Sequence, residues 1–228
     1  MNAIVQCDSL SRRYGTGDTS FYAVNEVSLA IGEGEFLSLS GPSGSGKTTL
    51  MNLLSGLDSP TSGQVSLDGR RLDTLERNAL ADLRLRRIGF VFQAYNLIPV
   101  LSARENVEFI MQLQGVPAKT RRERAEAMLE EVELKGLVDR RPGELSGGQQ
   151  QRVAVARAMA SAPAIVFADE PTANLDSATT DGLLTLMRQL NDDRGMTFCI
   201  ATHDPRVIEH TRRRIHMRDG RIESDEQK

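Results

Sequence analysis

Tryptophan is absent from this sequence of 228 residues, cysteine occurs only twice, and there is no long run of apolar residues. Cys7 and Cys199 are far apart and match no metal-ligand spacing, which fits a reducing compartment and predicts two buried thiols. A helix needs about 18 consecutive apolar residues to cross a bilayer, and no segment approaches this length. Residues 1–5 lack the basic and apolar parts of a leader. We therefore expect a cytosolic chain that reaches a membrane only through a partner.

An excess of positive charge is also missing. The chain has 28 basic and 31 acidic residues and a formal net charge of -3, so it has no overall positive field to hold a phosphate polymer. We expect no nucleic acid partner, although net charge leaves a local basic patch open. The length and the hydrophobic content of 39% fit a folded chain of one sizeable domain or two small lobes.

Hydrophobic periodicity divides the chain into two α/β parts with a helical part between them. In the first ninety residues, the pattern predicts a helix at 47–55 that ends at Gly56, and strands at 27–31, 36–39, 64–67 and 88–92.

The pattern is helical from residue 102 to about residue 160. Ser102 with Glu105, and Thr120 with Glu123, fit capping boxes that begin helices. The remaining residues return to the α/β pattern, with strands at 164–168 and 197–202, a helix near 181–190, a hairpin at Asp219-Gly220 and a frayed polar tail at 223–228. The helical segment is therefore inserted into an α/β core.

A glycine-rich loop lies between the strand at 36–39 and the helix at 47–55. Its sequence, Gly41-Pro42-Ser43-Gly44-Ser45-Gly46-Lys47-Thr48, matches the pattern G-x-x-x-x-G-K-[ST]. Backbone N–H groups of such a loop converge on phosphate oxygens, and the following helix directs its positive end to the same point. Lys47 adds a full charge near the β and γ phosphates, and the hydroxyl of Thr48 can bind Mg²⁺. A flexible turn with an unrelated lysine does not account for the flanking strand and helix.

Two carboxylates follow the apolar residues 165–168, where open α/β sheets present ligand-binding groups. Asp169 is expected beside the Mg²⁺ shell, because hard divalent cations prefer carboxylate oxygen. Glu170 is the better general base, since one residue further on it can polarise a water without being tied to the metal. A solvated acidic turn is the alternative, and the presence of Lys47 upstream argues against it.

His203 ends the apolar run 197–202 and should emerge at the same sheet edge as Glu170. It could hydrogen-bond the γ phosphate or orient the attacking water. A lone histidine is often structural, and position alone does not decide between these roles. His210 and His216 have no comparable placement.

A third motif, Leu145-Ser146-Gly147-Gly148-Gln149, opens the helical residues 149–158. The serine hydroxyl and the two glycine N–H groups then lie at a positive helix end and form a second candidate anion site. In isolation, the same residues would fit a plain helix cap and turn equally well.

With these residues together, the chain resembles the nucleotide-binding domains of ABC ATPases over essentially its whole length. The motifs occur in the family's order: residues 41–48 resemble Walker A, Gln93 the Q-loop, 145–149 the signature, 165–170 Walker B, 173–176 the D-loop and His203 the switch histidine. The resemblance implies a single ABC ATPase domain over 1–228, of class α/β. It implies a P-loop NTPase core with a mixed sheet and an antiparallel β subdomain at 1–93 and 162–228, and a helical signature subdomain at 94–161.

The resemblance also implies a role for each site residue, with ATP and Mg²⁺ as cofactors. Glu170, His203 and Gln93 would be catalytic, and Thr48, Gln93 and Asp169 would hold Mg²⁺. Tyr14 would stack on adenine, but Tyr22 lies near enough to leave this assignment open. The residues implied to bind ATP are Tyr14, Gly41, Pro42, Ser43, Gly44, Ser45, Gly46, Lys47, Thr48, Thr49, Ser146, Gly147, Gly148 and Gln149.

Two partners follow from the resemblance. ABC ATPase domains pair head to tail, with the signature of one closing over the ATP held by Walker A of the other, which implies a homodimer around two ATP. The sequence segments at 88–93, 96–99, 105–107 and 171–176 resemble those of the macrolide-export and lipoprotein-release group of ABC ATPases. The ATPases of this group drive a membrane permease. The permease would dock near Ala94–Asn106, at the cytoplasmic face of the inner membrane. An ordinary loop with buried apolar residues is the alternative for this segment.

The sequence argues against two alternative functions. An ABC ATPase of DNA repair or of the ribosome would need no membrane partner, but the sequence has no long coiled-coil insertion, second ATPase domain or basic linker. A degenerate module that binds nucleotide without hydrolysing it would lack catalytic residues, whereas Glu170 and His203 are both present.

Overall fold

The computed structural model describes residues 3–228. Met1 and Asn2, on which part of the expectation about a leader falls, lie outside this range. Among residues 3–228, none of the helices is both long enough and apolar enough to span a bilayer.

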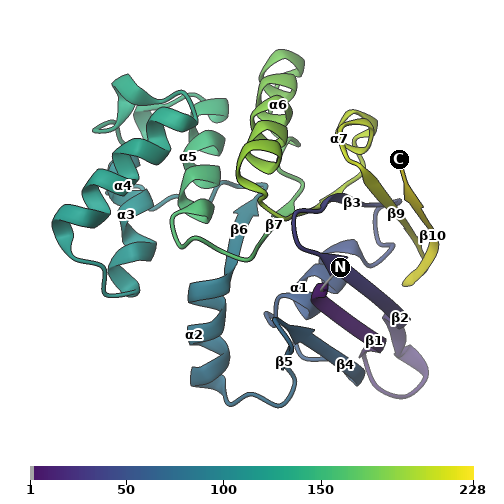
Figure 1. Cartoon of the computed structure of the whole chain (residues 1–228). Coiled ribbons are helices and arrows are strands. Elements are labelled where there is room, and N and C mark those ends of the chain that lie inside the picture. The colour runs from purple at the N-terminus through teal and green to yellow at the C-terminus, as the bar shows by residue number, and fades with distance from the viewer. Residues whose placement is uncertain (1–2) are drawn as a thin grey trace.

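The strands form two sheets (Figure 1). A four-stranded antiparallel sheet has the order β2-β1-β4-β5, and a six-stranded mixed sheet has the order β10-β9-β3-β8-β7-β6. The strands are β1 (Ala3–Tyr14), β2 (Phe21–Gly32), β3 (Phe36–Ser40), β4 (Ser62–Leu67), β5 (Arg70–Arg71), β6 (Ile88–Phe92), β7 (Ile165–Asp169), β8 (Phe198–Thr202), β9 (Arg213–Arg218) and β10 (Arg221–Gln227).

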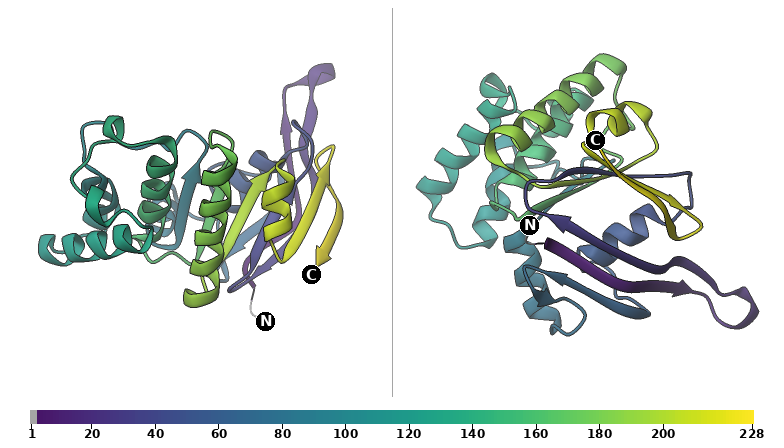
Figure 2. Two further views of the ribbon diagram at one scale, coloured as in Figure 1. Left: turned by 90° about the horizontal axis from the view of Figure 1, so that it is seen from above. Right: turned by 45° about the vertical axis from the view of Figure 1, so that its right-hand side comes forward.

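The helices cover both faces of the larger sheet. They are α1 (Lys47–Leu54), α2 (Arg77–Arg87), α3 (Ala103–Leu113), α4 (Ala118–Glu131), α5 (Gly147–Met159), α6 (Ser177–Arg194) and α7 (Pro205–His210), with single 3₁₀ turns at Gly17–Thr19, Lys135–Leu137 and Pro142–Glu144. Both views in Figure 2 place α3, α4 and α5 together at one end of the molecule, away from the smaller sheet.

The central strands pair in parallel and are buried on both faces, which explains why their sequences are largely apolar without a regular polar alternation. Successive side chains of a strand point to opposite faces, so each strand contributes to two cores. Phe167 and Cys199 pack with α1 in the core between the two sheets, whereas Val166 and Ile200 pack with α3 to α6 on the other face. The helical segment therefore shares its core with the large sheet.

The sequence predicted several elements correctly. The strand at 88–92, the hairpin at Asp219-Gly220 and the capping box of Ser102 and Glu105 are all confirmed. Cys7 and Cys199 are buried free thiols, as expected, and burial raises the pKa of both, for Cys7 to about 12.

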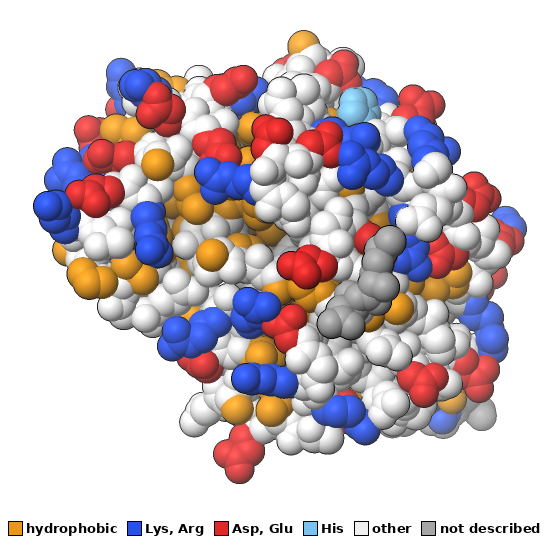
Figure 3. All heavy atoms as spheres, in the orientation of Figure 1, with side chains coloured by type: hydrophobic (Ala, Val, Ile, Leu, Met, Phe, Trp, Pro, Cys, Tyr) orange, Lys and Arg blue, Asp and Glu red, His pale blue; other side chains and the backbone are white. Residues whose placement is uncertain are grey.

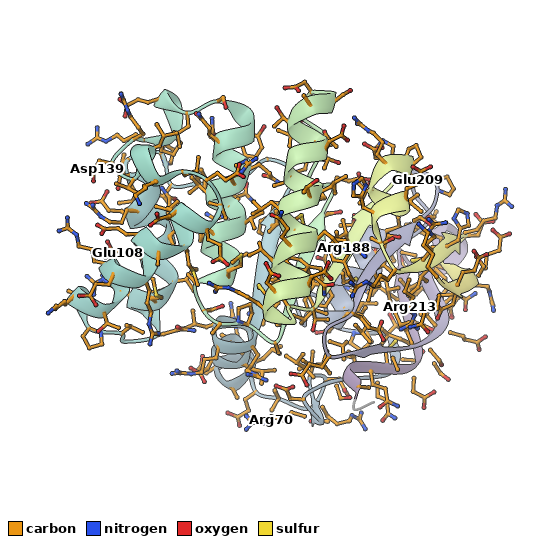
Figure 4. All side chains as sticks on the ribbon, turned by 45° about the horizontal axis from the view of Figure 1, so that its top comes forward. Arg70, Glu108, Asp139, Arg188, Glu209 and Arg213 are labelled. Atoms are coloured by element: carbon orange, nitrogen blue, oxygen red, sulfur yellow. The ribbon has the colours of Figure 1, made fainter. Side chains whose placement is uncertain are left out.

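Two local predictions are wrong. Thr120 caps no helix, because α4 already begins at Ala118, after Pro117, and takes Thr120 into its first turn. The polar tail from residue 223 is not frayed but belongs to strand β10, where Asp225 accepts hydrogen bonds of 2.8 and 2.7 Å from Arg213. Figure 4 labels Arg213, which also pairs with Glu35 at 2.8 Å. A charged edge strand lacks the apolar alternation by which strands are recognised in a sequence.

The two capping predictions can be compared by mutation. We expect Ser102→Ala to lower the free energy of unfolding by about 1 kcal/mol, because the Ser102 hydroxyl accepts a 3.2 Å hydrogen bond from the Glu105 N–H at the start of α3. The matched change Thr120→Ala should alter it by less than about 0.5 kcal/mol, since alanine is a better helix former. Urea unfolding of both variants tests this, and equal losses would contradict the assignment of the cap.

Candidate functional site

The glycine-rich loop joins the end of β3 to the start of α1. Gly46 has a φ of 101°, which side chains of L residues rarely adopt, and a β-carbon there would lie 2.2 Å from the carbonyl oxygen of Ala23. The glycine therefore lets the loop turn tightly against β2, and α1 begins at the next residue, Lys47. The loop thus directs the N-terminal end of α1, with its free N–H groups, toward the carboxyl edge of the large sheet.

Lys47 is held within this loop. Its side chain is only 8% exposed, and Nζ donates to the carbonyl oxygens of Gly41 at 2.8 Å and Pro42 at 3.0 Å. The loop therefore wraps around an ammonium group, and phosphate oxygens brought to the loop would meet this charge at close range.

A cavity of about 710 Å³ opens beside the loop. It is lined by residues of the loop, of α1 and of the small sheet, together with Gln93, Glu170 and His203. Most of the predicted site residues therefore lie around one hollow. The residues from the loop and from the small sheet are Pro42, Ser43, Gly44, Ser45, Gly46, Lys47, Thr48, Thr49, Tyr14, Phe21 and Ala23.

The aromatic wall of the cavity has two rings. Tyr14 is present, as predicted, with its hydroxyl donating to Asp58 at 2.8 Å. Phe21, which sequence reasoning missed, lies 6.0 Å from it between ring centroids. Tyr22 is not among the lining residues and instead lies near the guanidinium of Arg13. The period of two in β2 would have provided the signal, because Phe21 and Ala23 share the face that Tyr22 does not.

Thr48 and Asp169 meet across the junction of α1 and β7. The Thr48 hydroxyl lies 3.2 Å from each carboxylate oxygen of Asp169. Burial raises the pKa of Asp169, an effect that the Thr48 hydroxyl partly offsets. A cation between these groups would favour the ionised carboxylate.

The donor set fits Mg²⁺. Within residues 3–228 there is no group of three or more histidine, cysteine, aspartate or glutamate side chains that could enclose a metal. Mg²⁺ is commonly held by one or two carboxylates together with phosphate oxygens and waters, so one hydroxyl and one carboxylate beside a phosphate loop are sufficient protein ligands.

Glu170 and His203 form a second pair at the same edge. Glu170 Oε1 lies 2.7 Å from His203 Nδ1, and Oε2 accepts a 3.2 Å hydrogen bond from the Thr202 hydroxyl. Glu170 has a φ of 46°, a left-handed conformation that is costly for glutamate and that is often found at functional sites. Its carboxylate is thereby turned out of the strand direction and is held by two neighbours.

Gln93 follows β6 and is exposed in the cavity wall. Its backbone carbonyl accepts a 3.0 Å hydrogen bond from the side chain of Asn174. Asn174 belongs to the segment 173–176, whose last residue, Asp176, caps α6. The segments predicted as Q-loop and D-loop are therefore in direct contact.

Ser146 caps α5, with its hydroxyl accepting from the Gln149 N–H at 3.3 Å and its own N–H donating to the Gln149 side chain at 2.9 Å. None of the described residues from 146 to 149 lines the cavity. The structure thus brings together most of the predicted site residues but leaves the signature segment apart from them.

Comparisons with known proteins agree with this geometry. The family model described as ABC transporter matches residues 24–173. An uncharacterised ABC transporter ATP-binding protein of Thermotoga maritima is 44% identical over 228 residues, which is 100% of this chain and 97% of the relative. The macrolide export ATP-binding/permease protein MacB of Syntrophobacter fumaroxidans is 45% identical over 224 residues, and there the match covers 97% of this chain but only 31% of the relative.

A solved structure gives the same result. A dimeric structure of the ATP-binding cassette MJ0796, described as a post-hydrolysis state bound to ADP and Pi, has a TM-score of 0.89 and 42% identity, with 98% of each chain covered. The curated MJ0796 protein of Methanocaldococcus jannaschii is 43% identical over 227 residues, which is 98% of this chain and 97% of that protein. The chain belongs to the ABC transporter family and is one of its ATP-binding, ATP-hydrolysing proteins.

Proposed function

We propose that two copies of this chain close around two MgATP and hydrolyse them to drive a separate membrane permease. The observation that carries the proposal is the convergence of the phosphate loop, the pair of Thr48 and Asp169, and the pair of Glu170 and His203 around one cavity. These groups supply, in one place, phosphate binding, a metal site and a candidate base. A module that only bound nucleotide would need no such base.

ATP is expected to lie with its phosphates on residues 41–49 and its adenine against Tyr14, with Phe21 beside it. Thr48, Asp169 and Gln93 would hold Mg²⁺, which supplies charge stabilisation for the transferring phosphoryl group. Thr48 and Gln93 line the cavity, and the Asp169 carboxylate lies 3.2 Å from the Thr48 hydroxyl. This arrangement supports a single metal position beside Thr48.

Glu170 is proposed as the general base. Its carboxylate shares no hydrogen bond with Thr48 or Lys47 and is held by Thr202 and His203. It can therefore accept a proton from water while Asp169 serves the metal. His203 orients the carboxylate and can in turn hydrogen-bond the γ phosphate.

Glu170→Gln tests this division of roles. We expect the variant to bind MgATP with an affinity within about twofold of the parent and to hydrolyse it about 10²–10⁴-fold more slowly, because the amide cannot accept the proton. Binding of a fluorescent ATP analogue and phosphate release measure the two quantities. Glu33→Gln, in an exposed turn away from the cavity, is the control and should keep parental hydrolysis. A parental rate in Glu170→Gln would contradict the assignment of the base.

The separation of residues 146–149 from the cavity supports the head-to-tail dimer. Ser146 and the N–H groups of Gly147 and Gly148 lie at the positive end of α5 and can contact the γ phosphate of an ATP bound by a second copy. Closure of this kind would also exclude water from the reacting phosphate. The related MJ0796 cassette is dimeric in the structure that contains ADP and Pi.

Ser146→Arg should prevent this closure. A long cation at the start of α5 would collide with the partner's loop, so we expect ATP-dependent dimerisation in a Glu170→Gln background to be lost and hydrolysis by the otherwise unaltered chain to fall at least tenfold. Thr185→Arg, at an exposed position of α6, is the matched control. Analytical ultracentrifugation with and without ATP provides the measurement, and a Ser146→Arg variant that dimerises and hydrolyses normally would exclude the head-to-tail arrangement.

The segment Ala94–Asn106 and the adjoining groove are proposed to receive a cytoplasmic helix of the permease. Val100 is 72% exposed, while Leu97 packs against the core, so the segment is neither an ordinary polar loop nor wholly core. A groove of about 510 Å³ between α3 and α4 continues from it, with Leu101 and Phe109 between charged side chains. Glu108, labelled in Figure 4, pairs with Arg121 at 3.1 Å in the wall of this groove. An apolar centre with a charged rim suits an amphipathic helix.

Relatives support the permease and the direction of transport. The MacB relatives are named export ATP-binding/permease proteins, and this chain spans about a third of their length. We propose that the present chain supplies the ATPase part of such a transporter, in export, lipoprotein release or mechanical transmission, at the cytoplasmic face of the membrane. The face of the molecule in Figure 3 carries interspersed basic and acidic side chains, which offers no continuous positive surface for nucleic acid.

An affinity capture tests the permease. Tagged Glu170→Gln, incubated with ATP and Mg²⁺ and with detergent-solubilised membranes of the native host, should retain a polytopic membrane protein that mass spectrometry identifies. Adding Val100→Asp should reduce recovery at least several-fold, because it places a charge in the apolar contact. Leu57→Asp, at another exposed apolar position, should not. Recovery of the soluble dimer alone, under several detergents, would favour an ABC ATPase without a membrane partner.

A further inference from the structure

Arg157, in the last turn of α5, holds the segment that follows Gln93. Its Nη1 donates to the carbonyl oxygen of Asn96 at 2.5 Å, and its Nη2 donates to that of Tyr95 at 2.8 Å. Among the described residues, the hydrogen bonds of the Arg157 guanidinium go to these two carbonyl oxygens and to no carboxylate, and burial lowers its pKa. A partly buried cation without a counter-ion is costly, so these two hydrogen bonds are its main compensation.

The two carbonyls belong to a backbone conformation that the chain does not favour by itself. Tyr95 has a φ of 59° and Asn96 a φ of 52°, so two successive residues other than glycine are left-handed. This conformation is tolerable for asparagine but strained for a bulky residue such as tyrosine. The guanidinium of Arg157 donates to both carbonyls at once and so stabilises a left-handed turn that would otherwise favour glycine.

The same turn contacts the other end of α5. A β-carbon on Gly147 would lie 2.8 Å from the Tyr95 hydroxyl, so the Tyr95 side chain lies close against the start of α5, and a larger residue at position 147 would displace its hydroxyl. Gln93 itself is tied by its carbonyl to Asn174. The segment bearing Gln93 is therefore held by α5 near its start, through Tyr95 against Gly147, and near its end, through Arg157.

A second side chain of α5 acts in a similar way on the other catalytic loop. Gln151 is fully buried, and its Nε2 donates at 2.7 Å to the carbonyl oxygen of Pro171, the residue after Glu170. The Oε1 of Gln151 has no hydrogen-bond partner among the described residues. The hydrogen bond to Pro171 is therefore the polar contact that fixes the Gln151 side chain and ties α5 to the loop that follows Glu170.

We propose that Arg157 is a positioning residue for Gln93, through which α5 sets the Q-loop segment in place for Mg²⁺. This inference rests on the proposed role of Gln93 in binding the metal. Ser146 caps the start of α5 and Arg157 lies in its last turn. One helix therefore connects the serine that would contact a partner's ATP with the Gln93 segment that would serve the chain's own ATP. A displacement of α5 is then passed to Gln93 through the two carbonyls.

Arg157→Lys is the first test, in the purified chain with ATP and Mg²⁺. Lysine keeps the charge but cannot span two carbonyls with a planar fork. We expect kcat to fall about tenfold, within the ~10²-fold that a 1 Å misplacement can cause, with the KM for ATP changed less than about twofold. The Mg²⁺ concentration for half-maximal rate should rise several-fold. Arg214→Lys, in β9, removes a guanidinium hydrogen bond to the carbonyl oxygen of Ile208 in α7; this variant is the control and should change neither quantity.

A pair of substitutions at the exposed residue Asn96 tests the same turn without altering Arg157. Asn96→Val should reproduce the loss in kcat and the Mg²⁺ shift, since a β-branched residue is strained at this φ. Asn96→Gly should keep parental values. These two variants also test the role of the turn if Arg157→Lys fails to fold.

A double mutant shows whether Arg157 acts through Gln93. Gln93→Ala should lower the rate and weaken Mg²⁺ activation, and adding Arg157→Lys should lower the rate by no more than about a further twofold. The inference is overturned if a folded Arg157→Lys is unchanged, if Asn96→Gly is as impaired as Asn96→Val, or if the two losses multiply. An unchanged Gln93→Ala would instead overturn the proposed role of Gln93, and the inference with it.

Discussion

The site depends on the parallel pairing of β3, β7 and β8, which makes all three strands end at one edge of the sheet. Main-chain hydrogen bonds set Ser40 opposite Thr202 and Asp169 opposite Ala201. The phosphate loop leaves β3, Glu170 follows β7 and His203 follows β8. As a result, Thr48 and Asp169, which are 121 residues apart, and Glu170 and His203, which are 33 residues apart, meet within hydrogen-bond distance. The loops need no direct contact to bring them together, since strand register does so.

This constraint explains why so much of the site could be predicted from the sequence. A parallel sheet buried on both faces has largely apolar strands that are easily recognised, and Glu170 and His203 follow β7 and β8 directly. Lys47, Glu170 and His203 are therefore found by counting from the end of an apolar run. The boundaries of the helical subdomain, at residues 94 and 161, are harder to recognise and stay a prediction. The helical segment shares one apolar core with the large sheet, so no break in the packing marks them.

The parts that could not be predicted depend on weak or distant signals. The strand predicted at 27–31 begins at Phe21 in the structure, so Phe21, which lines the cavity, was not identified as part of a strand. Strand β10 has one apolar residue, Ile222, and pairs at the sheet edge with help from the ion pair of Asp225 and Arg213. Helix α2 has a single buried side chain, Leu83, so its apolar stripe is too narrow to detect.

Hydrogen bonds from a side chain to the backbone of another loop are harder still to predict, because the acceptors are carbonyl oxygens. Asn174, Arg157 and Gln151 each donate to a backbone carbonyl oxygen in the loops that follow β6 and β7, and every residue type has such an oxygen. The sequence thus contains the donors but nothing that marks their acceptors. All three donors come from α5 or the segment before α6, the two parts of the chain that lie beside the signature serine. The hydrogen bonds that hold these two loops therefore start from elements that the proposed dimer would place against a second copy. The arrangement of the loops thus depends on those elements as well as on the sheet.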